Sequence, residues 1–298
     1  MDVRPSPIAG RWYPGRATTL ARDVDRYLAE AQPERPEGLI RGLVVPHAGL
    51  PYSGPVAAWA FACLRGRAGQ PGDTGAAPDD PAAGDGSRLV ALVGPMHYPA
   101  RAGLLTSAHA AYATPLGDVP VDAAAVERLD QELRARGGPG LAAVRDDDEH
   151  ALEIELPFLQ RVLGLFQLLP VMVRDQRAAT AEALGEALAV TLSGRRALLV
   201  ASSDLSHYYP HEIARQLDAE LLDRLAAFDP RGVLARATGV ERGACGGAAV
   251  AAVLWAARAL GAERVSVLRY ATSADVTGDY GRVVGYAAAA VWQSPGDG

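Results

Sequence analysis

The sequence has few cysteines, no long uninterrupted apolar run and no cluster of basic residues. Two cysteines among 298 residues, Cys63 and Cys245, are too few for a disulfide framework and favour a reducing compartment. Residues 1–15 hold three prolines where a secretory signal would need an apolar run. The Ala-rich stretch 248–260 is interrupted by Arg258 and is shorter than the roughly 20 residues of a membrane span. We therefore expect a cytoplasmic protein that does not cross a membrane.

Charge and composition exclude two further classes of protein. The formal net charge is −6, and 29 basic residues are interspersed with 35 acidic ones along the chain. No basic stripe is available to neutralise a phosphate backbone, so nucleic acid is not an expected partner. Hydrophobic residues make up 49% and charged residues 21%, which is typical of a globular protein and excludes a disordered chain.

Short runs rich in leucine and β-branched residues alternate with helical patterns along the chain. This order is typical of a mainly parallel sheet with crossover helices. The expected strands are 39–45, 88–93, 166–173, 197–201, 264–270 and 281–292. The expected helices are 18–31, 55–64, 122–136, 150–163, 178–192, 211–228 and 245–260. We predict an α/β fold, a three-layer sandwich with a central, mostly parallel sheet flanked by helices.

No linker divides the chain into two cores, and no repeat of 20 to 50 residues is present. Residues 66–87 are rich in Gly, Ala, Pro and Asp and lack apolar periodicity, which predicts a flexible surface insertion between a helix and the next strand. We expect one domain over residues 1–298, with no chemistry in the insertion.

Three of the predicted strands run directly into a histidine. Residues 43–45 lead to His47, residues 89–93 lead to His97, and residues 198–200 lead to His207. Ligands of open α/β sheets bind beyond the carboxyl ends of the strands, so the three imidazoles are expected to converge. Each histidine taken singly also fits a turn or a helix cap, but three such placements favour a shared metal site, since imidazole is the commonest metal-binding side chain.

Cys245 is the candidate for an anionic ligand beside these imidazoles. It lies in the turn Gly243-Ala244-Cys245-Gly246-Gly247, which opens the predicted helix 245–260, and a helix N-terminus lowers the pKa of a thiol. The alternative interpretation is a small buried side chain at a tight contact between helix and sheet. Cys63, inside an apolar segment, is expected in the core.

Asp204 precedes His207 by three residues, and the two could form a carboxylate-imidazole pair that makes His207 an acid/base. Alternatively, Ser202, Ser203 or Asp204 caps the N-terminus of a helix, a position that all three residue types favour. The two roles do not exclude each other.

An acidic run, Asp146-Asp147-Asp148-Glu149, opens the predicted helix 150–163. Acids in a first helical turn interact favourably with the helix dipole, which explains the run without any function. A functional interpretation concerns Glu149, His150 and Glu153, whose spacing could present supporting groups to a metal from one helix face. The run lacks the second histidine of a zincin motif. His109 and His211 follow no predicted strand and are expected at the surface.

These motifs together resemble the Memo family, including its prokaryotic members called AmmeMemoRadiSam system protein B. The similarity extends over nearly the whole chain apart from the insertion. The segments that carry it are Ala9-Gly10-Arg11-Trp12-Tyr13-Pro14, Val45-Pro46-His47-Ala48-Gly49, Tyr52-Ser53-Gly54, Gly94-Pro95-Met96-His97, Asp148-Glu149-His150-Ala151-Leu152-Glu153, Ser202-Ser203-Asp204-Leu205-Ser206-His207, Ala244-Cys245-Gly246, Tyr270-Ala271-Thr272-Ser273 and Gly285-Tyr286-Ala287-Ala288.

The resemblance implies a fold like that of the class III extradiol dioxygenases, which are non-haem iron enzymes. It implies that His47, His97 and Cys245 are metal ligands, with the cysteine where the dioxygenases have a carboxylate. His207 would then be the acid/base, with Asp204 and His150 beside it. Tyr98 and the residues after Cys245 depart from some relatives, which puts the shape of the pocket in question. Radical-SAM-system proteins are expected partners by family association only.

Three functions are compatible with this set of residues. The first is an oxidoreductase that uses iron or copper, with oxygen or a small molecule as substrate. The second is a hydrolase that uses zinc on the same ligands. The third is an adaptor without catalysis, which binds a metal or a peptide in the same crevice. We expect the first of these functions, and the other two are the alternatives.

Overall fold

The computed structural model describes residues 2–66 and 88–295. Its central feature is a mixed sheet, which within the described residues has nine strands in the order β10-β12-β2-β9-β3-β8-β4-β7, with β11 also paired to β12. These strands are β2 (Leu39–Val45), β3 (Arg88–Pro95), β4 (Leu104–Ser107), β7 (Ala142–Val144), β8 (Phe166–Val173), β9 (Ala197–Ser202), β10 (His207–Tyr209), β11 (Arg264–Thr272) and β12 (Val283–Gln293).

The four central strands, β2, β9, β3 and β8, are parallel, as the continuous apolar runs predict. Their residues are buried on both faces, which is why they show no alternation of polar and apolar side chains. Outside this centre, β12 runs antiparallel to β2, β10 and β11, and β4 runs antiparallel to β8. The edge strand β7 is parallel to β4. The expected mostly parallel sheet is thus a mixed sheet with a parallel centre.

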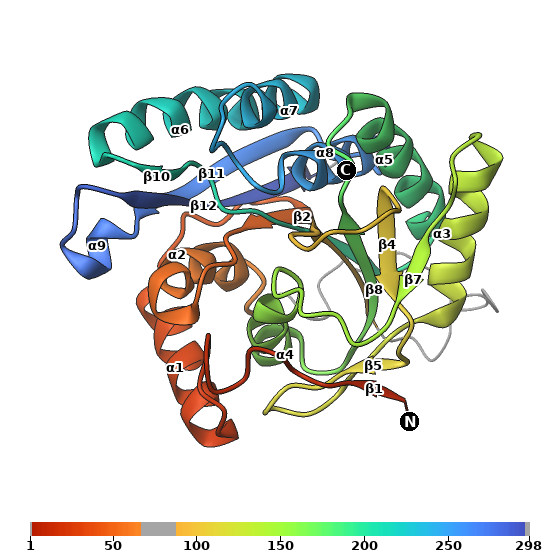
Figure 1. Cartoon of the computed structure of the whole chain (residues 1–298), viewed down its shortest axis with the longest axis horizontal. Coiled ribbons are helices and arrows are strands. Elements are labelled where there is room, and N and C mark those ends of the chain that lie inside the picture. The colour runs from red at the N-terminus through yellow and green to blue at the C-terminus, as the bar shows by residue number, and fades with distance from the viewer. Residues whose placement is uncertain (1, 67–87, 296–298) are drawn as a thin grey trace.

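Helices cover both faces of this sheet (Figure 1). Leu43 and Val45 of β2 face one apolar core, whereas Val44 between them faces the other. The first core contains side chains of α1 (Ala17–Glu30), α2 (Leu50–Ala62) and α4 (Leu156–Leu163). The second contains side chains of α3 (Ala123–Ala135), α5 (Ala178–Leu192), α6 (His211–Ala226), α7 (Pro230–Thr238) and α8 (Gly247–Ala259). The predicted α/β architecture with flanking helices is confirmed.

The strand order determines where the site can form. β9 lies between β2 and β3, although β9 begins at Ala197, long after β2 ends at Val45 and β3 ends at Pro95. The carboxyl ends of three adjacent parallel strands therefore meet at one edge, and each leads into a segment with a predicted ligand or acid/base residue. This is the position at which open α/β sheets bind ligands.

Local departures from the predicted elements have identifiable causes. The helix predicted from residue 150 starts later, as a 3-10 turn Glu153–Glu155 followed by α4, because the backbone N–H groups of His150 and Ala151 donate to the Glu149 side chain. α2 starts at Leu50 and contains Pro55, which was predicted to open it. A small sheet of β1 (Val3–Arg4), β5 (Ala111–Tyr112) and β6 (Val119–Pro120) was not predicted. The short strands β4, β7 and β10 of the main sheet and the helices α7 and α9 (Ala274–Thr277) were not predicted either.

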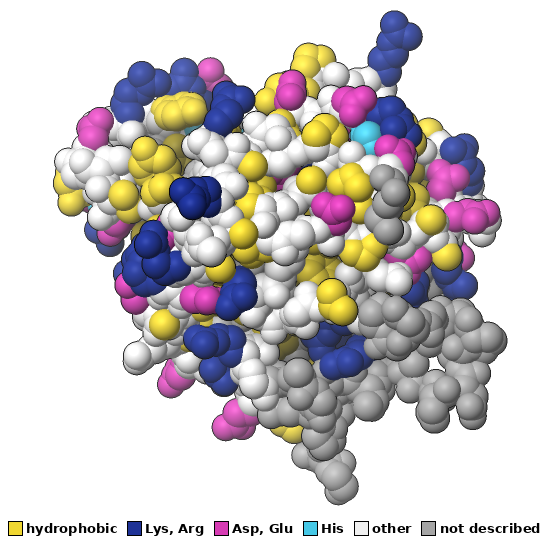
Figure 2. All heavy atoms as spheres, turned by 90° about the horizontal axis from the view of Figure 1, so that it is seen from below, with side chains coloured by type: hydrophobic (Ala, Val, Ile, Leu, Met, Phe, Trp, Pro, Cys, Tyr) yellow, Lys and Arg dark blue, Asp and Glu magenta, His cyan; other side chains and the backbone are white. Residues whose placement is uncertain are grey.

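Three further expectations concern the surface. Beyond residue 66, the predicted insertion 66–87 lies outside the described residues, and the single-domain assignment stays a prediction. In the part of the chain that is described, no helix has the length and apolar character needed to cross a membrane. Figure 2 shows basic and acidic side chains intermingled on one face, as the interspersed charges of the sequence predict.

Candidate metal centre

His47 lies two residues beyond β2 and is 1% exposed. Its Nδ1 atom is 2.9 Å from the hydroxyl of Ser202. That hydroxyl also lies 2.7 Å from the Ala151 carbonyl, which can only accept, so the serine oxygen is left to accept the Nδ1–H of His47. Burial, together with the neighbouring histidines, holds the pKa of His47 well below its usual range. His47 is therefore a neutral imidazole with Nε2 available as a ligand.

His97 follows β3 and is held by Glu149. The carboxylate of Glu149 accepts the backbone N–H of His97 at 2.6 Å and lies 2.9 Å from its Nδ1 atom. Burial would raise the pKa of Glu149, but the hydrogen bonds from His97 and the backbone N–H of Ala151 lower it, so Glu149 is an anion. An anionic acceptor at Nδ1 fixes the tautomer that leaves Nε2 of His97 as the ligand atom.

Cys245 lies two residues before α8, and its sulfur is 3.1 Å from Nε2 of His47. The next residue, Gly246, approaches β9 closely: a Cβ there would lie 2.4 Å from the Ser202 carbonyl oxygen. The expected lowering of the thiol pKa by the helix N-terminus is wrong for this chain. Burial of the thiol, together with the charge of Asp204, raises the pKa of Cys245 instead. A cation at this point is what would favour the thiolate.

His47, His97 and Cys245 each offer one ligand atom, and these atoms all lie within 4.8 Å of one another. Two ligand atoms of one tetrahedral ion lie roughly 3.5 Å apart, because the bonds from metal to nitrogen or sulfur are about 2.0–2.3 Å long. The rings of His47 and His97 meet edge to face at 82°, with centroids 5.2 Å apart. The three residues that the sequence singled out as ligands are thus brought to one point, with a donor set that fits a transition metal.

In a second set of possible donors, the ligand atoms also lie within 4.8 Å of one another. This set consists of His97, Glu149 and His150. The rings of His97 and His150 are stacked, with an interplanar angle of 14°. Each imidazole lone pair lies in the plane of its ring, so two parallel stacked rings cannot both direct a lone pair at one ion. The Glu149 oxygen instead forms a hydrogen bond with Nδ1 of His97 at 2.9 Å, whereas Nδ1 of His150 lies 3.4 Å from it. We conclude that Glu149 supports the first set and does not build a second one.

His150 lies between the cluster and an aromatic residue near the N-terminus. Its ring centroid is 5.4 Å from that of His47 and 4.1 Å from that of Trp12. Burial lowers the pKa of His150 to about 4, against the opposing charge of Glu149. The ring is therefore neutral at pH 7 and forms a wall of the site.

His207 begins β10 and is only partly buried. Its Nδ1 atom is 3.1 Å from the carbonyl oxygen of Gly243, which can only accept, so Nδ1 carries the proton and Nε2 has a free lone pair. Burial lowers the pKa of His207, and the nearby His97 also lowers it. A neutral imidazole in this position can take up a proton.

The predicted pair of Asp204 and His207 does not form, because the two side chains have different partners. Asp204 accepts the backbone N–H of His47 at 2.8 Å and also that of Ala48, so it supports the loop that carries the ligand. Burial raises the pKa of Asp204 to about 7. The alternative of a helix cap is wrong too, since Ser202 ends β9 and the chain continues into β10.

Three other predicted placements are corrected. Glu153 lies away from the cluster, where it binds Arg4, Ser6 and Tyr13, because the turn before α4 directs it to the N-terminal segment. His109 is 5% exposed and not at the surface, since Asp2 reaches its Nδ1 atom at 2.9 Å. His211 is half-buried, with Nδ1 at 3.1 Å from the Thr272 hydroxyl. Cys63 lies in the core, as predicted.

Sequence reasoning missed the residues whose hydrogen bonds and ring contacts hold the ligands in place. Ser202 was considered only as a cap, and Glu155, which is 1% exposed and 2.9 Å from the Ser202 hydroxyl, was not assigned to the site. Burial raises the pKa of Glu155 well above its usual range. Trp12 and Arg4 were not assigned to the site. Trp12 belongs to a segment that carries the family resemblance, whereas no signal marks Arg4 in the sequence.

Comparison with known proteins gives a consistent result over nearly the full chain. A family model described as Memo-like protein matches residues 4–290. A MEMO1 family protein of Methanopyrus kandleri is 33% identical over 96% of this chain and 97% of its own length. One of Methanosarcina mazei is 33% identical over 97% and 98%, and one of Methanothermobacter thermautotrophicus is 36% identical over 83% of each chain. A solved structure of an uncharacterised Escherichia coli K12 protein overlaps 68% of this chain and 85% of that one, at a TM-score of 0.40 and 14% identity, which is too distant to support an argument.

Proposed function

This chain belongs to the Memo family, and on that premise we propose that it is a metal-dependent oxidoreductase in which His47, His97 and Cys245 hold one iron or copper ion. The observation that supports this proposal most directly is the convergence of two imidazoles and one sulfur within 4.8 Å. The fold we propose for it is that of the class III extradiol dioxygenases, with a thiolate in the place of their carboxylate.

The donor set narrows the choice of metal to transition ions. Two imidazoles and one anionic ligand suit non-haem iron, while the soft thiolate favours copper. Such an ion, when bound, supplies one-electron chemistry with oxygen and open positions for a substrate. Because the thiolate changes the redox behaviour of the site, ring opening of catechols is not carried over from the dioxygenases.

The chain's own residues provide the remaining functions. His207, with Nδ1–H donated to Gly243, offers Nε2 to take a proton from a small-molecule substrate. Glu149 and Ser202 fix the tautomers of His97 and His47, so that each presents Nε2 to the shared point. Trp12 and His150 form an aromatic wall that limits the access of water on one side.

A second candidate is a zinc hydrolase on the same three ligands, with His207 as the general base. The observation that favours it is the cysteine itself, because zinc commonly takes mixed histidine and cysteine ligands. If the site binds no metal, the remaining function is that of an adaptor, which would use the crevice for recognition.

Elemental analysis of the purified protein, prepared without added metal under reducing and anaerobic conditions, tests the proposal. We expect one equivalent of iron or copper, lost in His47→Ala and strongly reduced in Cys245→Ser. Oxygen consumption by the loaded protein should be lost with the metal. His211→Ala is a matched control, because this histidine lies outside the cluster and should leave the metal content unchanged.

The outcomes separate the candidates. Stoichiometric zinc together with hydrolysis of ester or amide substrates would replace the first proposal by the second. A protein that takes up no iron, copper or zinc would exclude both enzymes.

A further inference from the structure

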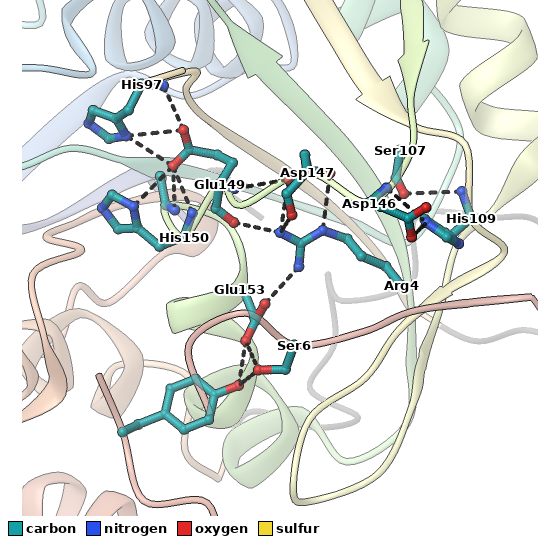
Figure 3. Close-up of polar contacts among 12 residues, drawn as sticks. Arg4, Ser6, His97, Ser107, His109, Asp146, Asp147, Glu149, His150 and Glu153 are labelled. Carbon is teal, nitrogen blue, oxygen red and sulfur yellow. Dashed lines mark hydrogen bonds and ion pairs between the residues drawn. The ribbon is translucent and has the colours of Figure 1, made fainter. Parts of the chain in front are cut away.

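Arg4 lies in the short strand β1, far from the metal ligands in sequence, and is 1% exposed. A buried guanidinium is costly unless it is fully hydrogen-bonded to anions or carbonyls. Arg4 meets this condition through one segment, residues 147–153, which precedes α4 (Figure 3). The N-terminal strand is thereby joined to the loop that holds His97.

The hydrogen bonds of Arg4 hold both ends of the segment 147–153. Its guanidinium donates to the two carboxylate oxygens of Asp147 at 2.8 and 3.1 Å and to the Asp147 carbonyl at 3.0 Å. It also donates to the Glu149 carbonyl at 2.7 Å and to a carboxylate oxygen of Glu153 at 2.6 Å. The planar fork of arginine suits such a set, which an ammonium group cannot reproduce.

Glu149 transmits this arrangement to the ligand. Arg4 holds its carbonyl, and Asp147 accepts its backbone N–H at 3.1 Å, so the backbone of Glu149 is fixed on both sides. The carboxylate of Glu149 then reaches the backbone N–H and Nδ1 of His97. Figure 3 shows this chain of contacts from Arg4 through Glu149 to the His97 ring.

Without Arg4, the carboxylates of this segment would be left without their shared cation. Asp147 and Glu153 are 6% and 0% exposed, so water screens their repulsion poorly. Tyr13 and Ser6 satisfy only the other oxygen of Glu153. The segment would have to move apart or take up protons, and Glu149 lies in the middle of it.

We propose that Arg4 is a positioning residue for the metal centre: by holding the backbone of Asp147 and Glu149, it directs the Glu149 carboxylate at His97 and so sets the orientation and metal affinity of that ligand. The inference rests on the proposed function, because it takes His97 as a ligand. It extends that function to the N-terminal strand, which contributes no ligand itself.

The competing explanation is that Arg4 only stabilises the fold through a buried ion pair. A loss of folding stability in an Arg4 variant therefore does not test the proposal, so the metal affinity of the same variant must also be measured. We choose Co²⁺ as the probe, since its visible absorption reports imidazole and thiolate ligands directly. The variants are Arg4→Gln, Arg4→Lys, Glu149→Gln and the double variant Arg4→Gln with Glu149→Gln.

Loss of a group that orients a ligand typically weakens metal binding by about 10- to 100-fold. We expect Arg4→Gln to weaken Co²⁺ binding by about tenfold or more and to change its absorption spectrum. Arg4→Lys should recover part of the Co²⁺ affinity, since lysine keeps the positive charge but lacks the planar set of donors of the guanidinium. If Arg4 acts through Glu149, the double variant should bind Co²⁺ no more weakly than Glu149→Gln alone.

The matched control is Arg195→Gln. Arg195, which is 17% exposed, forms an ion pair with Asp122 at 2.6 Å, at the opposite end of β9 from the site. This variant should lower the stability of the fold while its Co²⁺ affinity and spectrum remain those of the wild type. A similar loss of affinity in both arginine variants would mean that Arg4 is merely structural, and would overturn the proposal.

A measurement on the metal-free protein separates this inference from the proposed function. In ¹⁵N NMR spectra of the imidazoles, wild-type His97 should be the Nδ1–H tautomer, and Arg4→Gln should mix the two tautomers. That result would support the positioning role even if the wild type bound no metal. An unchanged His97 tautomer together with unchanged Co²⁺ affinity would refute it.

If Arg4→Gln fails to fold, Asp147→Asn replaces it, because this variant removes the charge of the carboxylate that Arg4 holds. Its Co²⁺ affinity and its His97 tautomer are then measured, with the same outcomes expected.

Discussion

Replacing Ser202 by alanine tests the hydrogen bonds that hold the His47 ring. The Ser202 hydroxyl is fully buried and lies 2.9 Å from Nδ1 of His47, 2.9 Å from Glu155 and 2.7 Å from the Ala151 carbonyl. Alanine leaves the Nδ1–H of His47 without an acceptor and the Glu155 carboxyl without its partner. Each buried polar group left unpaired costs about 1–3 kcal/mol, so the metal-free fold should lose stability in this range or somewhat more.

The effect on metal binding should be separate from the effect on folding. Without its acceptor, His47 can place the proton on Nε2, the atom that faces Cys245, and that tautomer cannot bind a metal. We expect Ser202→Ala to weaken metal binding by about 10- to 100-fold, or about 1.4–2.7 kcal/mol. Competition with a chelator of known affinity measures the metal, and urea unfolding of the metal-free protein measures stability.

Thr191→Val is the matched control for this experiment. Thr191 is 1% exposed, and its hydroxyl donates to the Ala187 carbonyl inside α5. The variant removes a buried hydroxyl without touching the site, so it should change stability but not metal affinity. Metal affinity within twofold of wild type in Ser202→Ala would show that Ser202 does not set the tautomer of His47, and would refute the reasoning.

Three further predictions follow from burial and charge. Burial raises the pKa of Cys245, so in the metal-free protein this thiol should react with iodoacetamide more slowly than free cysteine at every pH from 7 to 9, as mass spectrometry of the labelled peptide will show. The pKa of Asp204 rises on folding to about 7, so its carboxyl costs stability progressively as pH increases from about 4 to 7; Asp204→Asn should therefore stabilise the protein at pH 8, by at most a few kcal/mol, and much less at pH 4 in urea unfolding. Leu198→Ala, at a fully buried position of β9, should cost about 2–5 kcal/mol of stability in the same assay while metal affinity stays unchanged.

The central strands could be predicted from the sequence because their apolar residues are consecutive. Leu39–Val45 and Phe166–Val173 have the bounds expected for them. Strands buried on both faces are rich in apolar residues, and in these two only Arg41, Gly42, Gln167 and Pro170 interrupt the apolar side chains. The short strands β1, β4, β5, β6, β7 and β10 were missed because runs of two to four residues carry no recognisable period. The late start of α4 was missed as well, since a side-chain interaction of Glu149 replaced the first helical turn.

The sequence by itself determined the candidate ligands, because a histidine directly after a buried strand has only one edge of the sheet on which to lie. Only the tertiary structure decided how these residues are used. The insertion of β9 between β2 and β3 brought the segments together, and contacts across more than 140 residues tied Arg4 to Asp147 and Glu149. Such pairings depend on which strands become neighbours and on which polar groups are left buried together, and neither is encoded in a local pattern. The raised pKa of Cys245 has the same origin, since burial in the assembled fold outweighs the nearby helix terminus from which a lower pKa was predicted.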